Sequence, residues 1–201
     1  MNQSAGVFFY SKTTNRFLYL LRTDNKNPGN WGIPGGKIEN DETIIEGLER
    51  ECIEELGNFP TYTKLMPLEK FTSTDGVFEY NTWVCVIEQE FVPTLNDEHV
   101  GYAWIDKSHW PKPMHPGLWS TVNIDAIKEK LELWRESAPG EYPRIDTVFP
   151  LSSWMHVAHG LGLLNQEAFK KRADDLMLEA KAGVRYQHYR SNINNVLKSC
   201  L

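Results

Sequence analysis

The sequence predicts an α/β fold for residues 1–138 and a helical extension for residues 139–201. Short apolar segments separated by turn-forming residues fill the first hundred positions, as is typical of strands. A glutamate-rich segment of helical length interrupts them, and an amphipathic helix follows them. The charge then changes, because the extension holds eight basic and six acidic side chains while residues 1–138 hold thirteen and twenty-one.

The predicted strands are rich in Val, Phe, Tyr and Leu. They cover residues 6–10, 16–21, 62–73, 77–88 and 102–105. The polar segment between the first two predicts a hairpin with a longer loop. Pro34-Gly35-Gly36 should break any regular element. Met114-His115-Pro116-Gly117 reads as a rigid, exposed turn.

Two helices are expected in the first part of the chain, over residues 42–56 and 120–137. In the second, apolar side chains recur at spacings of three, four and seven: Val122, Ile124, Ile127, Leu131 and Trp134. The extension is predicted to be mainly helical, with residues 166–182 as its best segment.

Composition excludes several classes of protein. A net charge of −6 argues against a general polyanion binder. The three cysteines have neither metal-ligand nor disulfide spacing, and no apolar segment is long enough to cross a membrane. The first residues do not resemble a signal peptide, so a reducing, cytoplasmic setting is expected.

The glutamates of the first helix are the strongest functional signal. Glu51, Glu54 and Glu55 lie three and four residues apart, so they project together beside the apolar stripe. Three like charges within one turn repel one another unless a cation lies among them. Carboxylate oxygens suit Mg²⁺ or Mn²⁺. The alternative is a solvated acidic helix with i,i+4 ion pairs, in which Arg50 neutralises part of the excess.

These residues resemble the Nudix box over residues 36–58. Seven positions match: Gly36, Glu42, Arg50, Glu51, Glu54, Glu55 and Gly57, the last five within the run Arg50-Glu51-Cys52-Ile53-Glu54-Glu55-Leu56-Gly57. Cys52 and Asn58 depart from the pattern, since both positions are usually bulky and aliphatic. Asn58 follows the helix, so its departure concerns the packing of the next strand more than the chemistry.

The resemblance implies a Nudix-type α/β/α sandwich with a mixed sheet, and metal-assisted hydrolysis of a phosphoanhydride. It also implies that Glu51, Glu54 and Glu55 bind the divalent ion with help from the carbonyl of Gly36. We count Arg50 and Glu54 among the catalytic candidates.

A second candidate site follows at residues 95–104, which resemble the late acidic loop of many Nudix hydrolases. Glu98 is the candidate general base or further metal ligand, and Asp97 and His99 are its rivals. An ordinary polar turn before a strand is the alternative. Glu54 remains a competing candidate for the base.

Arg22 and Trp31 are the candidate substrate-binding residues. Arg22 ends a predicted strand and could reach a phosphate, although a surface ion pair would also explain it. Trp31 could stack on a base, as could Tyr80, Trp83 and Trp104, although most such side chains belong to the core. His156 and His159 are a helical spacing apart, but two ligands do not make a metal site.

The predicted function is divalent-metal-dependent hydrolysis of a small nucleotide, which the resemblance leaves open among nucleoside triphosphates, dinucleoside polyphosphates, ADP-ribose and similar compounds. The alternative is a Nudix-derived sensor whose tail contacts a partner, and the intact Glu51, Glu54 and Glu55 count against it. We expect no membrane partner and no nucleic acid except as a 5′ end. The extension could form a homodimer contact or a lid.

Overall fold

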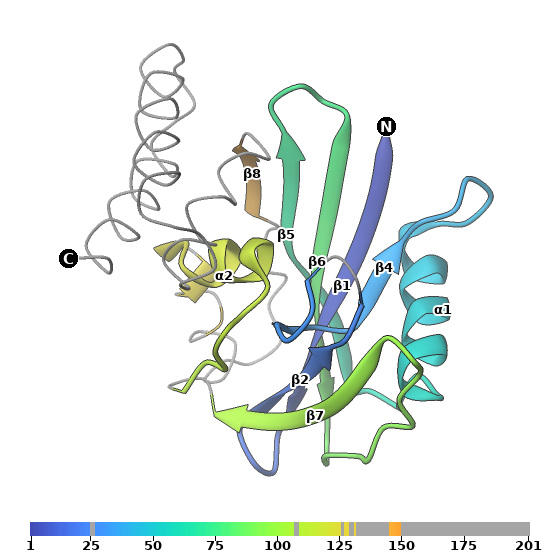
Figure 1. Cartoon of the computed structure of the whole chain (residues 1–201), viewed down its shortest axis with the longest axis vertical. Coiled ribbons are helices and arrows are strands. Elements are labelled where there is room, and N and C mark those ends of the chain that lie inside the picture. The colour runs from blue at the N-terminus through green and yellow to red at the C-terminus, as the bar shows by residue number, and fades with distance from the viewer. Residues whose placement is uncertain (25–26, 107–108, 126, 129–130, 132–144, 150–201) are drawn as a thin grey trace.

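The computed structural model describes residues 1–24, 27–106, 109–125, 127–128, 131 and 145–149. Within this part of the chain, one mixed sheet of eight strands lies between two helices (Figure 1). The α/β/α sandwich predicted above is therefore confirmed. Trp134, His156, His159 and the predicted helix at residues 166–182 lie outside the described residues.

The sheet has the strand order β3-β2-β1-β6-β5-β8, with β4 paired to β1 and β7 paired to β2. The pairs β1–β6 and β5–β8 are parallel and the other pairs are antiparallel. The strands are β1 (Asn2–Ser11), β2 (Arg16–Arg22), β3 (Trp31–Gly32), β4 (Gly35–Lys37), β5 (Lys64–Ser73), β6 (Phe78–Ile87), β7 (His99–Asp106) and β8 (Ile145–Phe149). The last of these adds a strand from the predicted extension to the sheet.

The two faces of the sheet carry separate hydrophobic clusters. On one face, Phe9, Leu18 and Cys85 pack with Leu48, Cys52 and Leu56 of helix α1 (Ile44–Leu56). On the other face, Phe8, Tyr19 and Val84 pack with Leu118 and Val122 of helix α2 (Pro116–Val122). Alternating side chains of the central strands thus anchor one helix on each side.

Helix α1 begins two residues later than predicted because Thr43 is its N-cap. The Thr43 hydroxyl accepts from the backbone of Glu46, and the Glu46 carboxylate accepts from the backbone of Thr43, which makes a capping box. The helix ends at Gly57, whose φ of 82° is the left-handed conformation that glycine adopts without strain. Asn58 is exposed, and the neighbouring Phe59 packs against the core on this face.

The predicted helix at residues 120–137 is wrong at its start and in its continuity. Helix α2 begins at Pro116, whose fixed φ suits the first position of a helix, and Asn123 terminates it. Helical residues resume at Asp125. The apolar periodicity is nonetheless confirmed as far as the structure describes it, since Val122, Ile124, Ile127 and Leu131 are all buried.

The turn expected at residues 114–117 is not exposed, because Met114 is buried in the core and Pro116 is a buried residue of α2. The break predicted at Pro34-Gly35-Gly36 is also wrong, since β4 begins at Gly35 and pairs with β1. Gly35 has a φ of 140°, and a Cβ there would overlap the carbonyl oxygen of Ala5. A glycine is therefore what permits β4 to approach β1 this closely.

None of the helices in the described part of the chain is long and apolar enough to span a membrane.

Candidate active site

Strand β4 and helix α1 bring Gly35 and Gly36 against two glutamates of the box. The backbone N–H of Gly35 donates to Oε2 of Glu55 at 2.8 Å. A Cβ at Gly36 would lie 2.3 Å from Oε2 of Glu51, so this carboxylate lies directly against the glycine backbone. The absence of a side chain at Gly36 is therefore what makes room for Glu51.

Glu55 is a buried carboxyl group. Its residue is 3% exposed, and burial raises its pKa to about 8, against the lowering effect of the Gly35 hydrogen bond. Nε2 of His99 lies 3.8 Å from Oε1 of Glu55. Burial lowers the pKa of His99 to about 4, so this imidazole is neutral at pH 7.

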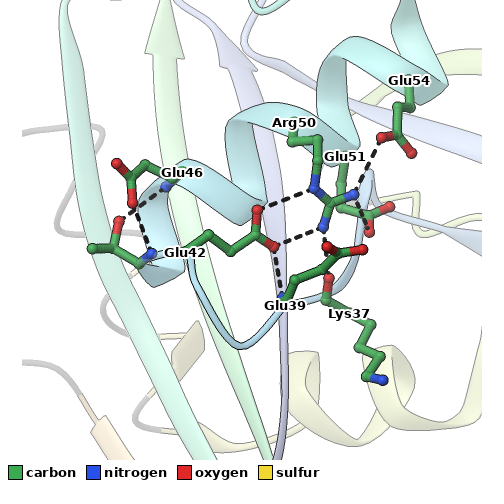
Figure 2. A network of polar contacts seen from close by, with 8 residues as sticks. Lys37, Glu39, Glu42, Glu46, Arg50, Glu51 and Glu54 are labelled. Carbon is green, nitrogen blue, oxygen red and sulfur yellow. Dashed lines mark hydrogen bonds and ion pairs between the residues drawn. The ribbon is translucent and has the colours of Figure 1, made fainter.

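Arg50 joins the start of the box to its glutamates (Figure 2). Its guanidinium donates to both carboxylate oxygens of Glu42, at 2.8 and 3.1 Å, and to the carbonyl oxygen of Lys37 at 2.9 Å. It also donates to Glu51 at 2.9 Å and to Glu54 at 3.2 Å. The side-chain hydrogen bond from Arg50 is the main cause that lowers the pKa of Glu42. Arg50 therefore fixes the loop after β4 to α1.

The three glutamates occupy different environments, which the helical spacing did not predict. Glu51 is half-buried, and burial raises its pKa despite the hydrogen bond from Arg50. The side chain of Glu54 is 56% exposed, whereas Glu55 lies in the interior. Among the described residues, no three Asp, Glu, His or Cys side chains are grouped closely enough to hold one ion together.

A cavity of about 600 Å³ lies beside this cluster. Gly36, Lys37 and Glu51 line it from the box, and Arg22 and Asp24 line it from the end of β2. Arg22 and Asp24 form an ion pair. Its other walls come from β1, β5, β6 and α2, through residues that include Ser4, Glu69, Phe71, Tyr80, Thr82, Ser120 and Thr121.

Glu98, the acidic residue chosen from the late loop, also lines the cavity. The backbone carbonyl of Glu98 accepts from Thr23, and its N–H donates to Asn96, so the loop is held against the end of β2. Asp97 is exposed and is not among the lining residues. His99 instead lies beneath the loop, next to Glu55. Of the three rivals, Glu98 alone borders the cavity.

The two predicted substrate-binding residues are placed differently. Arg22 lines the cavity, whereas Trp31 packs against the core on the α2 side and exchanges backbone hydrogen bonds with the segment before α2. Trp83 and Trp104 pack against the core beneath α1. Of the four aromatic residues considered above, Tyr80 is therefore the one that borders the cavity.

Sequence reasoning missed Asp24, Glu69 and Thr121 as cavity residues. Glu69 is 2% exposed and accepts a 2.7 Å hydrogen bond from the Thr121 hydroxyl. The signal that could have identified Glu69 was an acidic residue inside the otherwise strand-like segment 62–73. The face of the sheet to which the Glu69 side chain points depends on a bulge between Pro67 and Glu69. The alternation of apolar residues along the strand does not reveal this bulge.

Comparison with known proteins supplies both the family and the class of enzyme. The model of the NUDIX domain matches residues 2–122. The chain therefore belongs to the Nudix family, and it is a Nudix pyrophosphohydrolase.

The curated relatives include a dihydroneopterin triphosphate diphosphatase of Haemophilus influenzae, 30% identical over 65% of this chain and 87% of the relative. A nucleoside triphosphatase NudI of Escherichia coli is 36% identical over 44% of this chain and 72% of the relative. Among solved structures, a NUDIX hydrolase from Nitrosomonas europaea superimposes with a TM-score of 0.51 at 17% identity, covering 74% of this chain and 78% of that one. This last similarity concerns the fold.

Proposed function

We propose that this protein hydrolyses the triphosphate of a nucleoside or of a nucleoside-like heterocycle, with Mg²⁺ or Mn²⁺ as its cofactor. The observation that carries the proposal is the cavity, in which the carboxylates of Glu51 and Glu98 and the guanidinium of Arg22 border a space of about 600 Å³. Such a volume suits a small organic ligand. The names of both curated relatives specify triphosphate substrates, which favours this class over ADP-ribose and dinucleoside polyphosphates.

The oxygen atoms around Gly36 fit a hard divalent ion. The Glu51 carboxylate lies against the backbone of Gly36, in a space that a Cβ would fill. Glu51 and the Gly36 carbonyl would hold the ion, and Glu54 and Glu55, which are not grouped with Glu51 in this structure, would have to turn toward it when it binds. When bound, such an ion neutralises phosphate charge and lowers the pKa of a water molecule.

The protein's own side chains would supply the remaining chemistry. Glu98, which borders the cavity from a loop held against β2, would accept the proton of the attacking water. Arg22, which also lines the cavity, would neutralise a substrate phosphate. Arg50 would act through its hydrogen bonds, by keeping Glu51 and the loop after β4 in place. Glu54 is the competing candidate for the base.

The proposal is tested by measuring hydrolysis of nucleoside triphosphates with Mg²⁺, with Mn²⁺ and with EDTA. We expect turnover that requires the ion and falls at least about 100-fold in Glu51→Gln or Glu54→Gln. Glu49→Gln is the matched control, because Glu49 carries the same side chain on the same helix but is not one of the three glutamates proposed to hold the ion. Undiminished turnover in EDTA, or no turnover of any triphosphate, would contradict the proposal. Binding without turnover would instead favour a sensor.

A further inference from the structure

The hydroxyl group of Tyr80 lies directly over a glycine of the neighbouring strand. Tyr80 of β6 is registered opposite Ser4 of β1, but its side chain reaches Gly6, two residues further along β1. A Cβ at Gly6 would lie 2.2 Å from the Tyr80 hydroxyl oxygen and 3.1 Å from the ring carbon that carries it. Gly6 therefore leaves open the space in which this hydroxyl lies.

This position is at the carboxylate end of the cavity. Gly6 is registered opposite Gly35 of β4, whose backbone N–H donates to Glu55. The next residue of β4 lies against Glu51, which lines the same cavity as Tyr80. The Tyr80 hydroxyl therefore lies where the proposed function places the phosphates of the substrate.

The Tyr80 hydroxyl is open to the cavity. Tyr19 and Tyr80 both pack on the face of the sheet that α2 covers. In the part of the chain that the structure describes, the Tyr19 hydroxyl is enclosed by protein without a hydrogen-bond partner. The Tyr80 hydroxyl is not enclosed in this way, because Tyr80 is only partly buried and lines the cavity. It can therefore bond to a molecule in the cavity.

A phenol supplies this end of the cavity with a neutral hydrogen-bond donor. Burial raises the pKa of Tyr80 above its ordinary value, and the negative charge of Glu55 adds to the rise. The hydroxyl therefore keeps its proton and can donate it in a hydrogen bond. An ionised carboxylate such as that of Glu51 can only accept, so it cannot bond to a phosphate oxygen in this way.

We propose that the Tyr80 hydroxyl donates a hydrogen bond to an oxygen of the substrate's phosphate chain, and that Gly6 is the residue that lets it reach this position. Donors aimed at phosphate oxygens stabilise the negative charge that develops there during hydrolysis. The inference rests on the proposed function, since it takes the phosphates to lie at the carboxylate end of the cavity.

The test compares kcat/KM of the wild type with that of Tyr80→Phe, which keeps the ring and removes only the hydroxyl. The substrates are GTP, ATP, ADP-ribose and a dinucleoside polyphosphate, each with Mg²⁺. We expect a loss of at least about 10-fold on every substrate that the wild type hydrolyses, because one hydrogen bond to a charged group is removed. An unchanged kcat/KM would overturn the inference, as would a loss that depends on the base.

Tyr19→Phe is the matched control. It removes a hydroxyl from the same face of the sheet, but Tyr19 does not line the cavity. Removing a buried donor that has no partner should leave kcat/KM within about threefold of the wild type. Equal losses in Tyr19→Phe and Tyr80→Phe would mean that both hydroxyls have only a structural role, and the inference would be wrong.

Gly6→Ala tests the position of the hydroxyl. The added Cβ should displace it, so we expect a loss similar to that in Tyr80→Phe and no further loss in the double variant. Losses that multiply in the double variant would overturn the inference, because the hydroxyl would then act from a place that residue 6 does not control.

Calorimetric binding of inorganic triphosphate with Mg²⁺ separates this inference from the proposed function. Binding that is about 10-fold weaker in Tyr80→Phe than in the wild type and Tyr19→Phe would support the inference even if no nucleotide were hydrolysed. If no nucleotide is hydrolysed, equal binding by the three proteins, or binding by none, would overturn it. Hydrolysis of nucleoside triphosphates at equal rates by all three proteins would overturn the inference and leave the proposed function standing.

Discussion

The backbone N–H of Gly35 donates a 2.8 Å hydrogen bond to the buried carboxyl group of Glu55. This bond connects β4, at the start of the Nudix box, to the last turn of α1. It also provides a polar partner for a side chain that lies in the core beneath the cavity. The burial that makes this bond necessary raises the pKa of Glu55 to about 8.

Glu55→Gln should stabilise the metal-free protein at alkaline pH. The pKa of Glu55 is about 8 in the folded state and near the ordinary value of 4.5 in the unfolded state. The stability that the protonated carboxyl group contributes is therefore lost as the pH rises from 4.5 through 8. The gain in the variant should be on the order of 5 kcal/mol at pH 8.5 and become small near pH 4.5. Urea unfolding of both proteins in EDTA across this pH range measures the difference in their free energies of unfolding.

Gln remains able to accept from Gly35, so the fold should persist in this variant. A pH-independent difference between the two proteins would show that Glu55 is ionised throughout the window. With saturating Mg²⁺ the wild type should be the more stable of the two proteins, because an ion stabilises its ionised carboxylate and binds Gln weakly.

Gly36→Ala should impair catalysis more than folding. The added Cβ would meet the end of the Glu51 side chain, which can rotate away at little cost but would then leave its position. We expect kcat/KM to fall by at least about 10-fold while the free energy of unfolding changes by less than about 1 kcal/mol. Gly101→Ala is the control, since a Cβ there makes only ordinary contacts with Leu21. Full activity in Gly36→Ala would show that catalysis does not require the Glu51 carboxylate to lie against the backbone of Gly36.

Arg50→Ala should lower both stability and activity, because Arg50 holds Glu42, the Lys37 carbonyl and Glu51 together. A loss of about 1–3 kcal/mol is expected from several charge-assisted hydrogen bonds at one partly buried group. Arg50→Lys should recover only part of this, since lysine lacks the planar fork. Chemical denaturation and steady-state kinetics measure the two effects.

Arg16→Ala provides the comparison for Arg50. Arg16 also makes two hydrogen bonds to one carboxylate, that of Glu90, but it is more exposed and lies away from the cavity. Its loss should cost less than about 1 kcal/mol and leave kcat unchanged. Equal effects of the two substitutions would mean that Arg50 forms an ordinary surface ion pair.

Glu98→Gln should lower kcat by about 100- to 10,000-fold if Glu98 is the general base. Asp97→Asn should have little effect, because Asp97 carries the same charge in the same loop without bordering the cavity. A pH–rate profile should lose its acidic limb in Glu98→Gln. If the limb disappears in Glu54→Gln instead, Glu54 is the base.

Local sequence patterns predicted the elements whose determinants are close together along the chain. The apolar stripe of Leu48, Cys52 and Leu56 lies within one helix, so its spacing is sufficient, whereas the cap at Thr43 that sets the start of the helix was not predicted. The break between α2 and the next helical residues could not be predicted, because an uninterrupted apolar periodicity continues through Asn123.

The sequence by itself determined the family and the identity of the box residues, because their order and spacing within residues 36–58 are unusual and local. The tertiary structure alone decided that Glu55 is buried while Glu54 is exposed, since that depends on which side of α1 faces the sheet. It also decided that Glu69 faces the cavity. A bulge in β5 reverses the alternation of side chains there, and strand register brings together residues more than thirty positions apart.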